Sequence, residues 1–305
     1  MNVSSPPASQ KPDSLEKNTP ASSQANIITV LRPQHGLAAL NLSDLWTYRE
    51  LIYFMTLRDI QVRYKQTLLG AAWAVLQPVL QMVVFSMLFG GVAKISSDGL
   101  PYPLFNFAAL LPWGLFSRAI SDAGRSLVSN RNMITKIYFP RAVIPLASVL
   151  SGLVDFLIAF VVLVCLLVYY HFTPGSNFHF VFSPALLALP LLLLLTLVTA
   201  LGVSLWFAAM NVIYRDVGYI LPFITQLWFF VTPIVYSSSE VTGNLRLFYM
   251  LNPMTGVVEG FRWALLGTQF SAGNWLIVSV VISVLVLASG WVYFRQMERR
   301  FADEI

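Results

Sequence analysis

The sequence predicts an all-α integral membrane protein. We expect six transmembrane helices, an amphipathic helix before the first of them and re-entrant helices before the last. Hydrophobic residues make up 57% of its 305 residues and charged residues 11%, and the mean hydropathy is +0.69. A water-soluble chain would carry roughly twice that share of charge. The charges also fall mainly between long apolar runs, so this composition suits a lipid bilayer as solvent.

The N-terminal part of the chain divides into two segments. Residues 1–40 are rich in Ser, Pro, Ala, Asn and Gln and lack the apolar core of a secretory signal peptide. We expect them to form a disordered cytoplasmic tail. Residues 41–67 mix apolar side chains with charged ones such as Arg58, Arg63 and Lys65. This segment is too charged to span a bilayer, so we expect an amphipathic helix on the membrane surface, or one docked on a partner protein.

Six apolar segments follow, within a predicted transmembrane domain at 68–300. Each approaches or exceeds the length of about 20 residues that a helix needs to cross a bilayer. The six segments are residues 69–92, 105–124, 142–170, 184–210, 217–236 and 275–294.

The stretch 242–270, between the fifth and sixth segments, is apolar but is broken at Asn252 and Pro253. Each half is too short to cross a bilayer. The pattern favours two re-entrant helices, with a long surface loop as the alternative. Re-entrant backbone is tolerated where protein or a water-filled cavity covers it, so this stretch is a candidate part of a transport pathway.

The distribution of Lys and Arg predicts the orientation of the chain. Arg125, Arg131, Lys136 and Arg141 follow the second segment with no acidic residue among them, whereas residues 171–183 contain no Lys or Arg. Basic residues favour the cytoplasmic side, and an even number of spans places both termini on one side. We therefore expect a multi-pass protein of the bacterial inner membrane with both termini in the cytoplasm.

The sequence carries no pattern typical of catalysis or of a resident cofactor. It has no phosphate-binding GxxxxGK[ST] loop and no GxSxG or HExxH motif. Its one cysteine, Cys165, and its three scattered histidines give no metal-site spacing. The basic residues flank apolar segments, which disfavours nucleic-acid binding. We expect no catalytic residue, metal site or cofactor on this chain.

Three charged residues fall inside the apolar segments: Arg118, Asp122 and Asp155. Arg118 and Asp122 are four positions apart, so they could pair on one helix face. Asp155 could form a structural hydrogen bond between helices, or it could belong to a transport route.

Aromatic residues are abundant and clustered, as at Trp113 and Phe116 or at Trp228 and Phe229. Such rings commonly form belts at the membrane interfaces. Their faces also stack on the apolar faces of sugar rings, so an aromatic-lined pore with few charges would suit a long, hydroxyl-rich, weakly charged substrate.

Residues 131–139 mix basic residues with large apolar ones and precede Pro140. We expect a short helix whose apolar side chains form a partner surface. Folding back onto the protein's own helices is the alternative.

Several motifs in this order resemble the ABC-2 type permeases of polysaccharide exporters, which serve O-antigen, capsule and teichoic acid. LRDIQVRYKQTLLGAAWAVLQP enters the first segment, FAALLPWGLFSRAI lies in the second, and NRNMITKIYFPRAVIPLASVLSGLVDF leads into the third. WFAAMNVIYRDVGYILPFITQLWFFVTPIVY and LNPMTGVVEGFRWALLG follow. The resemblance covers roughly residues 40–300.

This resemblance implies a homodimer that works with two copies of a separate ATPase subunit, on which ATP and Mg would be bound. It implies export of a lipid-linked glycan, with O-antigen as the favoured glycan, and an interface-helix role for 41–67. The implied ATPase-coupling residues are Arg131, Asn132, Met133, Ile134, Thr135, Lys136, Ile137, Tyr138 and Phe139. The candidate channel-lining residues are Trp73, Phe85, Phe89, Trp228 and Phe229. The candidate periplasmic gate comprises Asn252, Pro253, Glu259 and Arg262.

Three other functions fit parts of the pattern. An ABC-2 exporter of a small molecule or lipid would use the same scaffold. An ion-coupled secondary transporter would need inverted repeats, which the two halves do not clearly display. A membrane-embedded glycosyltransferase would need acidic metal-binding motifs in its cytoplasmic loops.

Overall fold

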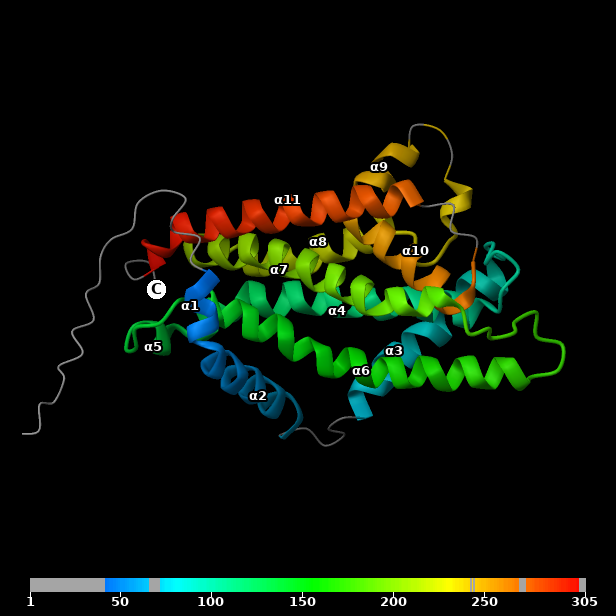
Figure 1. The fold of residues 1–305 in the computed structure, drawn as a ribbon, viewed down its shortest axis with the longest axis horizontal. Helices are drawn as coiled ribbons and strands as arrows, with labels where there is room; N and C mark the ends of the chain where they lie inside the picture. The colour runs from blue at the N-terminus through cyan, green and yellow to red at the C-terminus, as the bar shows by residue number, and fades with distance from the viewer. Residues whose placement is uncertain (1–41, 66–71, 242, 244, 269–272, 302–305) are drawn as a thin grey trace, which may run out of the picture. The chain divides into compact units, whose positions relative to one another are not determined.

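The computed structural model describes residues 42–65, 72–241, 243, 245–268 and 273–301. Within these ranges the regular elements are all helices (Figure 1), which confirms the predicted all-α class. The expected tail at 1–40 lies outside the described residues. So do the end of the segment 41–67, the start of the first apolar segment, and residues 242, 244, 269 and 270 of the expected re-entrant stretch.

One group of helices coincides with the six predicted apolar segments. This group consists of α3 (Ala72–Phe85) with its π-helical continuation η2 (Ser86–Val92), α4 (Tyr102–Ser129), α6 (Val143–Phe172), α7 (Leu189–Ile213), α8 (Val217–Val231) and α11 (Gly273–Glu298). The other helices are α1 (Leu42–Thr47), α2 (Arg49–Lys65), α5 (Arg131–Ile134), η3 (Pro184–Ala188), η4 (Ser238–Glu240), α9 (Leu245–Leu251) and α10 (Pro253–Leu266).

Four helical stretches are long and apolar enough to cross a membrane. They are Ala72–Val92, Val143–Phe172, Pro184–Ile213 and Trp275–Glu298. The helix α8 is apolar but its 15 residues cover about 22 Å, which is less than a bilayer core of about 30 Å. The helix α4 is long but is interrupted by charged residues.

The burial of α4 explains its less apolar composition. It packs against α6, α7, α10, α3 and α8, and its side chains Phe105, Phe116 and Ala123 are fully buried. Since neighbouring helices screen α4, polar side chains on it can face the interior of the bundle. The hydropathy of α4 alone therefore understates how deeply this helix is buried in the bundle.

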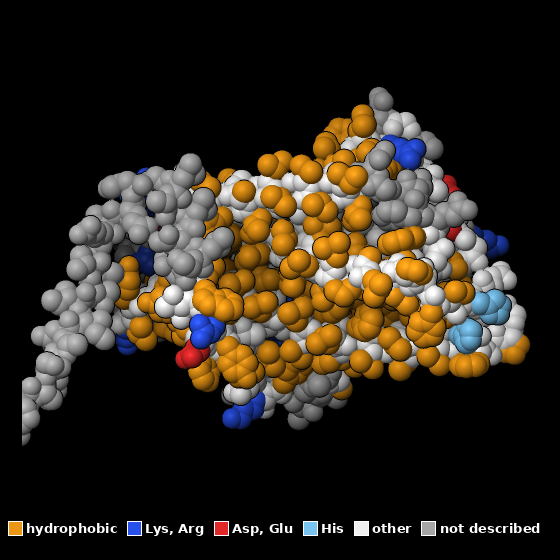
Figure 2. Space-filling model, viewed as in Figure 1, with side chains coloured by type: hydrophobic (Ala, Val, Ile, Leu, Met, Phe, Trp, Pro, Cys, Tyr) orange, Lys and Arg blue, Asp and Glu red, His pale blue; other side chains and the backbone are white. Residues whose placement is uncertain are grey.

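The outward faces of the other long helices are apolar. On α6, Leu157, Val161, Val164 and Val168 are all exposed, and their spacing places them on one helix face. Figure 2 shows hydrophobic side chains over most of the viewed face, with the coloured charged side chains near its two ends. Such a surface suits lipid rather than water.

Close helix contacts depend on small residues. A Cβ on Gly202 of α7 would lie 2.7 Å from the Cα of Leu287 in α11, and one on Gly290 would lie 2.3 Å from the carbonyl oxygen of Gly202. Glycines at these positions let the two backbones approach closely, as small residues do in membrane helix pairs.

Candidate functional site

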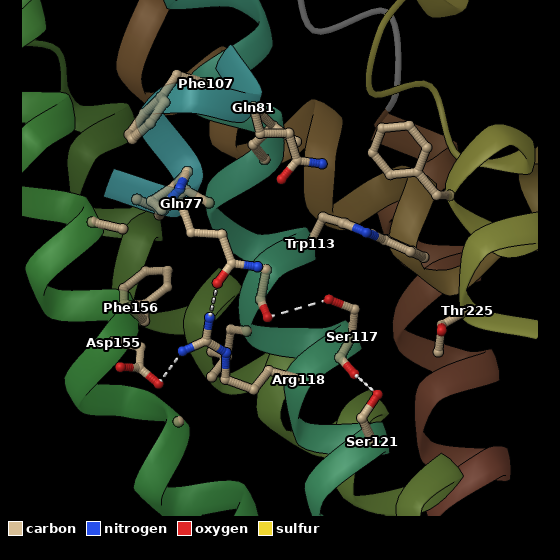
Figure 3. A pocket seen from close by; sticks show the side chains of 18 of the residues that line it. Gln77, Gln81, Phe107, Trp113, Ser117, Arg118, Ser121, Asp155, Phe156 and Thr225 are labelled. Carbon is tan, nitrogen blue, oxygen red and sulfur yellow. Dashed lines mark hydrogen bonds and ion pairs between the residues drawn. The ribbon is translucent and has the colours of Figure 1, made fainter. Parts of the chain in front are cut away.

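A groove with a volume of about 730 Å³ lies among α3, α4, α6 and α8 (Figure 3). Its polar lining consists of Gln77, Gln81, Ser117, Arg118, Ser121, Asp155, Thr225 and Gln226. Its aromatic lining consists of Phe85, Phe107, Trp113, Phe156, Phe229 and Phe230. Ring faces and hydrogen-bonding groups thus line the same space, a combination found in ligand sites.

An ionic cluster centred on Asp155 lies at one end of this groove. Arg63 of α2 and Arg118 of α4 both donate to Oδ2 of Asp155, the latter at 2.5 Å. The hydroxyl of Tyr64 donates to Oδ1. The side chain of Asp155 is 10% exposed, so its charge is nearly buried and is compensated by two arginines. Of the two roles expected for Asp155, the structure displays the first: its carboxylate accepts hydrogen bonds that connect separate helices.

The expected pairing of Arg118 with Asp122 is replaced by pairings across helices. Arg118 binds Asp155 of α6 and donates to Oε1 of Gln77 at 3.3 Å, as Figure 3 shows. Asp122 accepts from Nη2 of Arg63 at 2.7 Å. Helix spacing made the local pair possible, but α2 and α6 bring partners that the spacing could not reveal.

Tyr64 remains a hydrogen-bond donor under ordinary conditions. Burial, followed by the hydrogen bond to Asp155, raises the pKa of Tyr64 to about 12. A protonated phenol can donate to the carboxylate across the physiological pH range.

Two further hollows adjoin the groove. One of about 560 Å³ shares Ala74, Gln77, Arg118 and Asp155 with it. Another of about 540 Å³ shares Arg63 and Asp122 with the second hollow and reaches Asn130, next to α5. The three hollows therefore follow one another from the start of α5 to the aromatic residues of the groove, with the Asp155 cluster between them.

The candidate channel-lining residues fall in different places. Phe85 and Phe229 line the groove, with ring centroids 5.5 Å apart, and Trp73 lines the second hollow. Phe89 packs edge-on against Phe85 beside the hydrophobic core. Trp228 is not among the groove-lining residues; its ring meets Phe116 edge-on at 5.1 Å. The structure thus brings three of the five to the hollows.

The candidate gate residue Asn252 joins the start of α10 to the end of α8. Its Oδ1 accepts from the backbone nitrogen of Met254 at 3.1 Å, which caps α10, and from Nε1 of Trp228 at 3.0 Å. Its Nδ2 donates to Oγ1 of Thr232 at 2.9 Å. Pro253 occupies the first turn of α10, where its missing N–H costs nothing. This junction ties α10 to the end of α8.

The other two candidate gate residues form a buried pair. Arg262 is fully buried and lies 3.0 Å from Oε1 of Glu259. Its guanidinium also donates to the carbonyls of Pro233 and Ile234 at 2.7 Å and stacks on the ring of Phe105 at 3.6 Å. Arg262 therefore holds the irregular segment after α8, where backbone carbonyls lack helical partners.

The segment 131–139, for which we expected an ATPase-coupling role, forms a shorter helix than predicted. The helix α5 ends at Ile134, and residues 135–139 continue as turns, bends and irregular backbone. Pro140 disfavours the helical conformation for Phe139, and β-branched Thr135 and Ile137 weaken it further.

The burial of this segment divides its apolar residues into two groups. Ile134 and Phe139 are buried against the protein's own helices, and Met133 is half-buried. Ile137 and Tyr138 are 60% and 78% exposed. Arg131, Asn132, Thr135 and Lys136 are exposed as well. The fold-back alternative therefore applies to Ile134 and Phe139, whereas Ile137 and Tyr138 stay exposed, as the expected partner surface would require.

The expected interface helix is divided at Tyr48 into α1 and α2. The inner face of α2 packs on α6, where Met55 is buried and Oγ1 of Thr56 donates to the carbonyl of Ala147 at 3.4 Å. Its outer side leaves Tyr53, Phe54 and Val62 exposed. The helix is thus anchored to the bundle and still presents an apolar outer surface.

The amide lining of the groove was not singled out from the sequence. Gln77 and Gln81 are four positions apart in an otherwise apolar helix, which places both on one face. Two amides on one face of an apolar helix are a signal for a polar cavity. Among the described residues, no group of three His, Cys, Asp or Glu side chains could hold a metal ion.

Comparison with known proteins gives one family and several relatives. The ABC-2 type transporter family matches residues 50–266. The O-antigen export system permease protein RfbA of Myxococcus xanthus is 28% identical over 86% of this chain and 98% of its own length. RfbA of Klebsiella pneumoniae is 26% identical over 83% and 94%. The polysialic acid transport protein KpsM of Escherichia coli is 22% identical over 79% and 91%.

Proposed function

This chain belongs to the ABC-2 type transporter family, and we propose that it is the membrane subunit of an ATP-driven exporter of lipid-linked polysaccharide. The O-antigen relatives support this substrate class. The observation that carries the proposal is the groove, where aromatic rings lie beside amide and hydroxyl groups. Ring faces pack on the apolar faces of sugars, while amides both donate to and accept from sugar hydroxyls.

ATP would be hydrolysed by a separate subunit that holds ATP and Mg, since this sequence contains no phosphate-binding loop. The exposed pair Ile137 and Tyr138 offers an apolar docking point for that ATPase. The buried Ile134 and Phe139 would fix the docking point to the bundle.

Two copies of the chain would enclose the channel. The helices α3 and α8, on two sides of the groove, expose apolar side chains such as Leu80, Val84, Phe223 and Leu227. A second copy placed against these faces would bury them and close the groove from the lipid.

The topology that we propose has six spans and both termini in the cytoplasm of a bacterium. The helices α4 and α8 would add two spans to the four apolar ones. The helices α9 and α10 would form the re-entrant pair on the periplasmic side. Basic residues such as Arg125, Arg131 and Arg295 gather at the end with α5, which supports a cytoplasmic position for that end.

Motion would pass from the ATPase to the spans through α5 and α2. The ionic contacts of Arg63 connect α2 with both α4 and α6, so a rigid-body shift of α2 would displace the walls of the groove. Repeated ATP cycles would then move the polymer outward.

Deletion of the gene tests this function. The account predicts loss of one surface polysaccharide and accumulation of its lipid-linked form inside the cell, both reversed by the wild-type gene. Unchanged surface polysaccharide, measured by gel and sugar analysis of extracted cells, would refute the proposed substrate class.

A further inference from the structure

The charges that line the groove cancel one another. Among its described lining residues, the charged ones are Arg118 and Asp155, which bind each other at 2.5 Å. The second hollow adds Arg63 and Asp122, which are paired at 2.7 Å. The balance is two arginines and two aspartates, so neither hollow has an excess of positive charge.

The polar groups that remain are neutral. Gln77, Gln81 and Gln226 contribute amides from both sides of the groove, and Ser117 and Ser121 contribute hydroxyls. Each amide offers two donors and an acceptor, and each hydroxyl offers both functions. Such groups match the hydroxyls of a sugar without requiring a charge on it.

The opposite end of the bundle holds a separate hollow of about 800 Å³, lined by Asp98, Glu259 and Arg246. Glu259 is paired with Arg262. Asp98 accepts hydrogen bonds from Ser237 at 2.8 Å and Ser239 at 3.3 Å. Arg246 balances Asp98 in number, so this hollow also lacks an excess of positive charge.

The third hollow, next to α5, adds Arg58, which is paired with Asp59 at 2.8 Å, and Arg125, which donates to the carbonyl of Gly218 at 2.9 Å, so its lining has one arginine more than it has aspartates. A polyanion would need unpaired cations along the groove and the second hollow, and their arginines are paired with aspartates. Pores that conduct anions use rings of Arg or Lys, because an unpaired charge is costly to bring into a low-dielectric space. KpsM is named for polysialic acid, an anionic polymer, so membership of the family does not fix the charge of the cargo.

From this charge balance we infer that the exported glycan is built of uncharged sugars. This inference rests on the proposed function and narrows its substrate class. The aromatic side chains of the groove, such as Trp113 and Phe230, provide stacking surfaces that need no charge on the sugar. The arginines at the Asp155 cluster serve the protein's own carboxylates.

The glycan itself provides the first test. The polysaccharide that disappears on gene deletion is isolated from the wild-type strain, released from its lipid by mild acid and passed over an anion-exchange column at pH 8. The inference predicts that it elutes unretained. A retained, acidic polysaccharide would overturn the inference while leaving the proposed function intact, whereas no lost polysaccharide would overturn both.

Binding to the purified protein provides the second test. The full chain in lipid nanodiscs is titrated at low salt with maltoheptaose and with a sialic acid heptamer, and the combined fluorescence of its eight tryptophans reports binding. Maltoheptaose should bind at least tenfold more tightly than the anionic oligomer. Equal or tighter binding of the anionic oligomer, or no binding of either probe, would contradict the inference.

A pair of variants shows whether an added positive charge changes binding affinity only when it lies in the groove. Gln226 lines the groove and is exposed, so Gln226→Lys should be tolerated and should tighten binding of the sialic acid heptamer at least fivefold. Gln61 is exposed on α2 and does not line the groove, so Gln61→Lys adds the same charge as a control and should change neither affinity. An equal effect of both variants would place the binding elsewhere.

Discussion

Arg63, in the last turn of α2, forms an ion pair with Asp155 in α6, 92 positions further along the chain. Arg118 of α4 binds the same carboxylate oxygen. One nearly buried carboxylate thus connects three helices at the point where the groove meets the second hollow. Any movement of α2 relative to α4 and α6 must stretch or break these contacts.

Substitution of this carboxylate should loosen α2. In Asp155→Asn, Arg118 would lose its ion-pair partner and Arg63 would keep Asp122. Removing one member of a buried ion pair costs on the order of 3–5 kcal/mol. We expect a lower Tm of the purified protein, faster proteolysis within α2, and ATP hydrolysis that no longer drives export.

Asp122→Asn is the matched comparison. The side chain of Asp122 is 42% exposed, so solvent screens its charge and the loss should be clearly smaller. A Tm for Asp155→Asn equal to that of the wild type, or a larger drop for Asp122→Asn, would contradict the central position of Asp155.

The ATPase contact should depend on the exposed residues of the coupling segment. Ile137→Asp and Tyr138→Asp place a charge at positions that are 60% and 78% exposed, so the permease should fold normally. The proposed docking point would then carry a charge into an apolar groove of the ATPase. We expect copurification of the ATPase to fall at least tenfold.

Two controls accompany this experiment. Phe182 is 87% exposed in the loop before η3, so Phe182→Asp should leave copurification intact. Ile134 is buried, so Ile134→Asp should reduce the yield of folded permease itself. Full copurification of the ATPase with the Tyr138→Asp and Ile137→Asp variants would show that the ATPase docks at another surface.

Trp228 supports the junction at Asn252 through its indole nitrogen. Trp228→Phe keeps an aromatic ring against Phe116 but removes the 3.0 Å hydrogen bond to Asn252. A lost hydrogen bond of this kind costs about 1 kcal/mol. Export measured by surface polysaccharide should fall severalfold, while the amount of assembled complex stays unchanged.

Trp228→Ala removes the ring as well and should reduce export further. Equal export by wild type and both variants would exclude a role for this contact. Equal loss in both variants would assign the effect to the hydrogen bond alone.

Arg262 should tolerate no replacement by another cation. A lysine cannot reproduce the fork that reaches Pro233, Ile234 and Glu259 together. Each buried carbonyl left without a donor costs about 1–3 kcal/mol. Arg262→Lys should lower the Tm by several degrees and expose residues 233–241 to protease, whereas the wild type resists; unchanged resistance would refute this role.

The sequence predicted the helical class and the location of the apolar segments because a hydrophobic run can be recognised from the local sequence alone. Two helices depart from this pattern. The polar residues of α4 reflect its packing among other helices, and α8 ends at Val231 where Arg262 binds the following carbonyls. Both deviations depend on tertiary contacts that a hydropathy window does not contain.

The candidate site was also predicted only in part, because some of its contacts are tertiary. Asp155 and Arg118 were recognised as unusual inside apolar segments, and aromatic residues such as Phe85 and Phe229 do line the groove. The partners Arg63 and Tyr64 lie about 90 positions from Asp155, so no local spacing could reveal them. The coupling segment was predicted as one surface, yet its burial differs between Ile134 and Ile137.

The central claim is that this chain is a conduit driven by a separate ATPase, and transport in proteoliposomes tests it most directly. Vesicles containing the permease alone, or the permease with its ATPase, are loaded on one side with the lipid-linked glycan extracted from the deletion strain. The account predicts ATP-dependent movement of the glycan with the complex and none with the permease alone. Uphill movement of glycan or any other solute by the permease alone would contradict it.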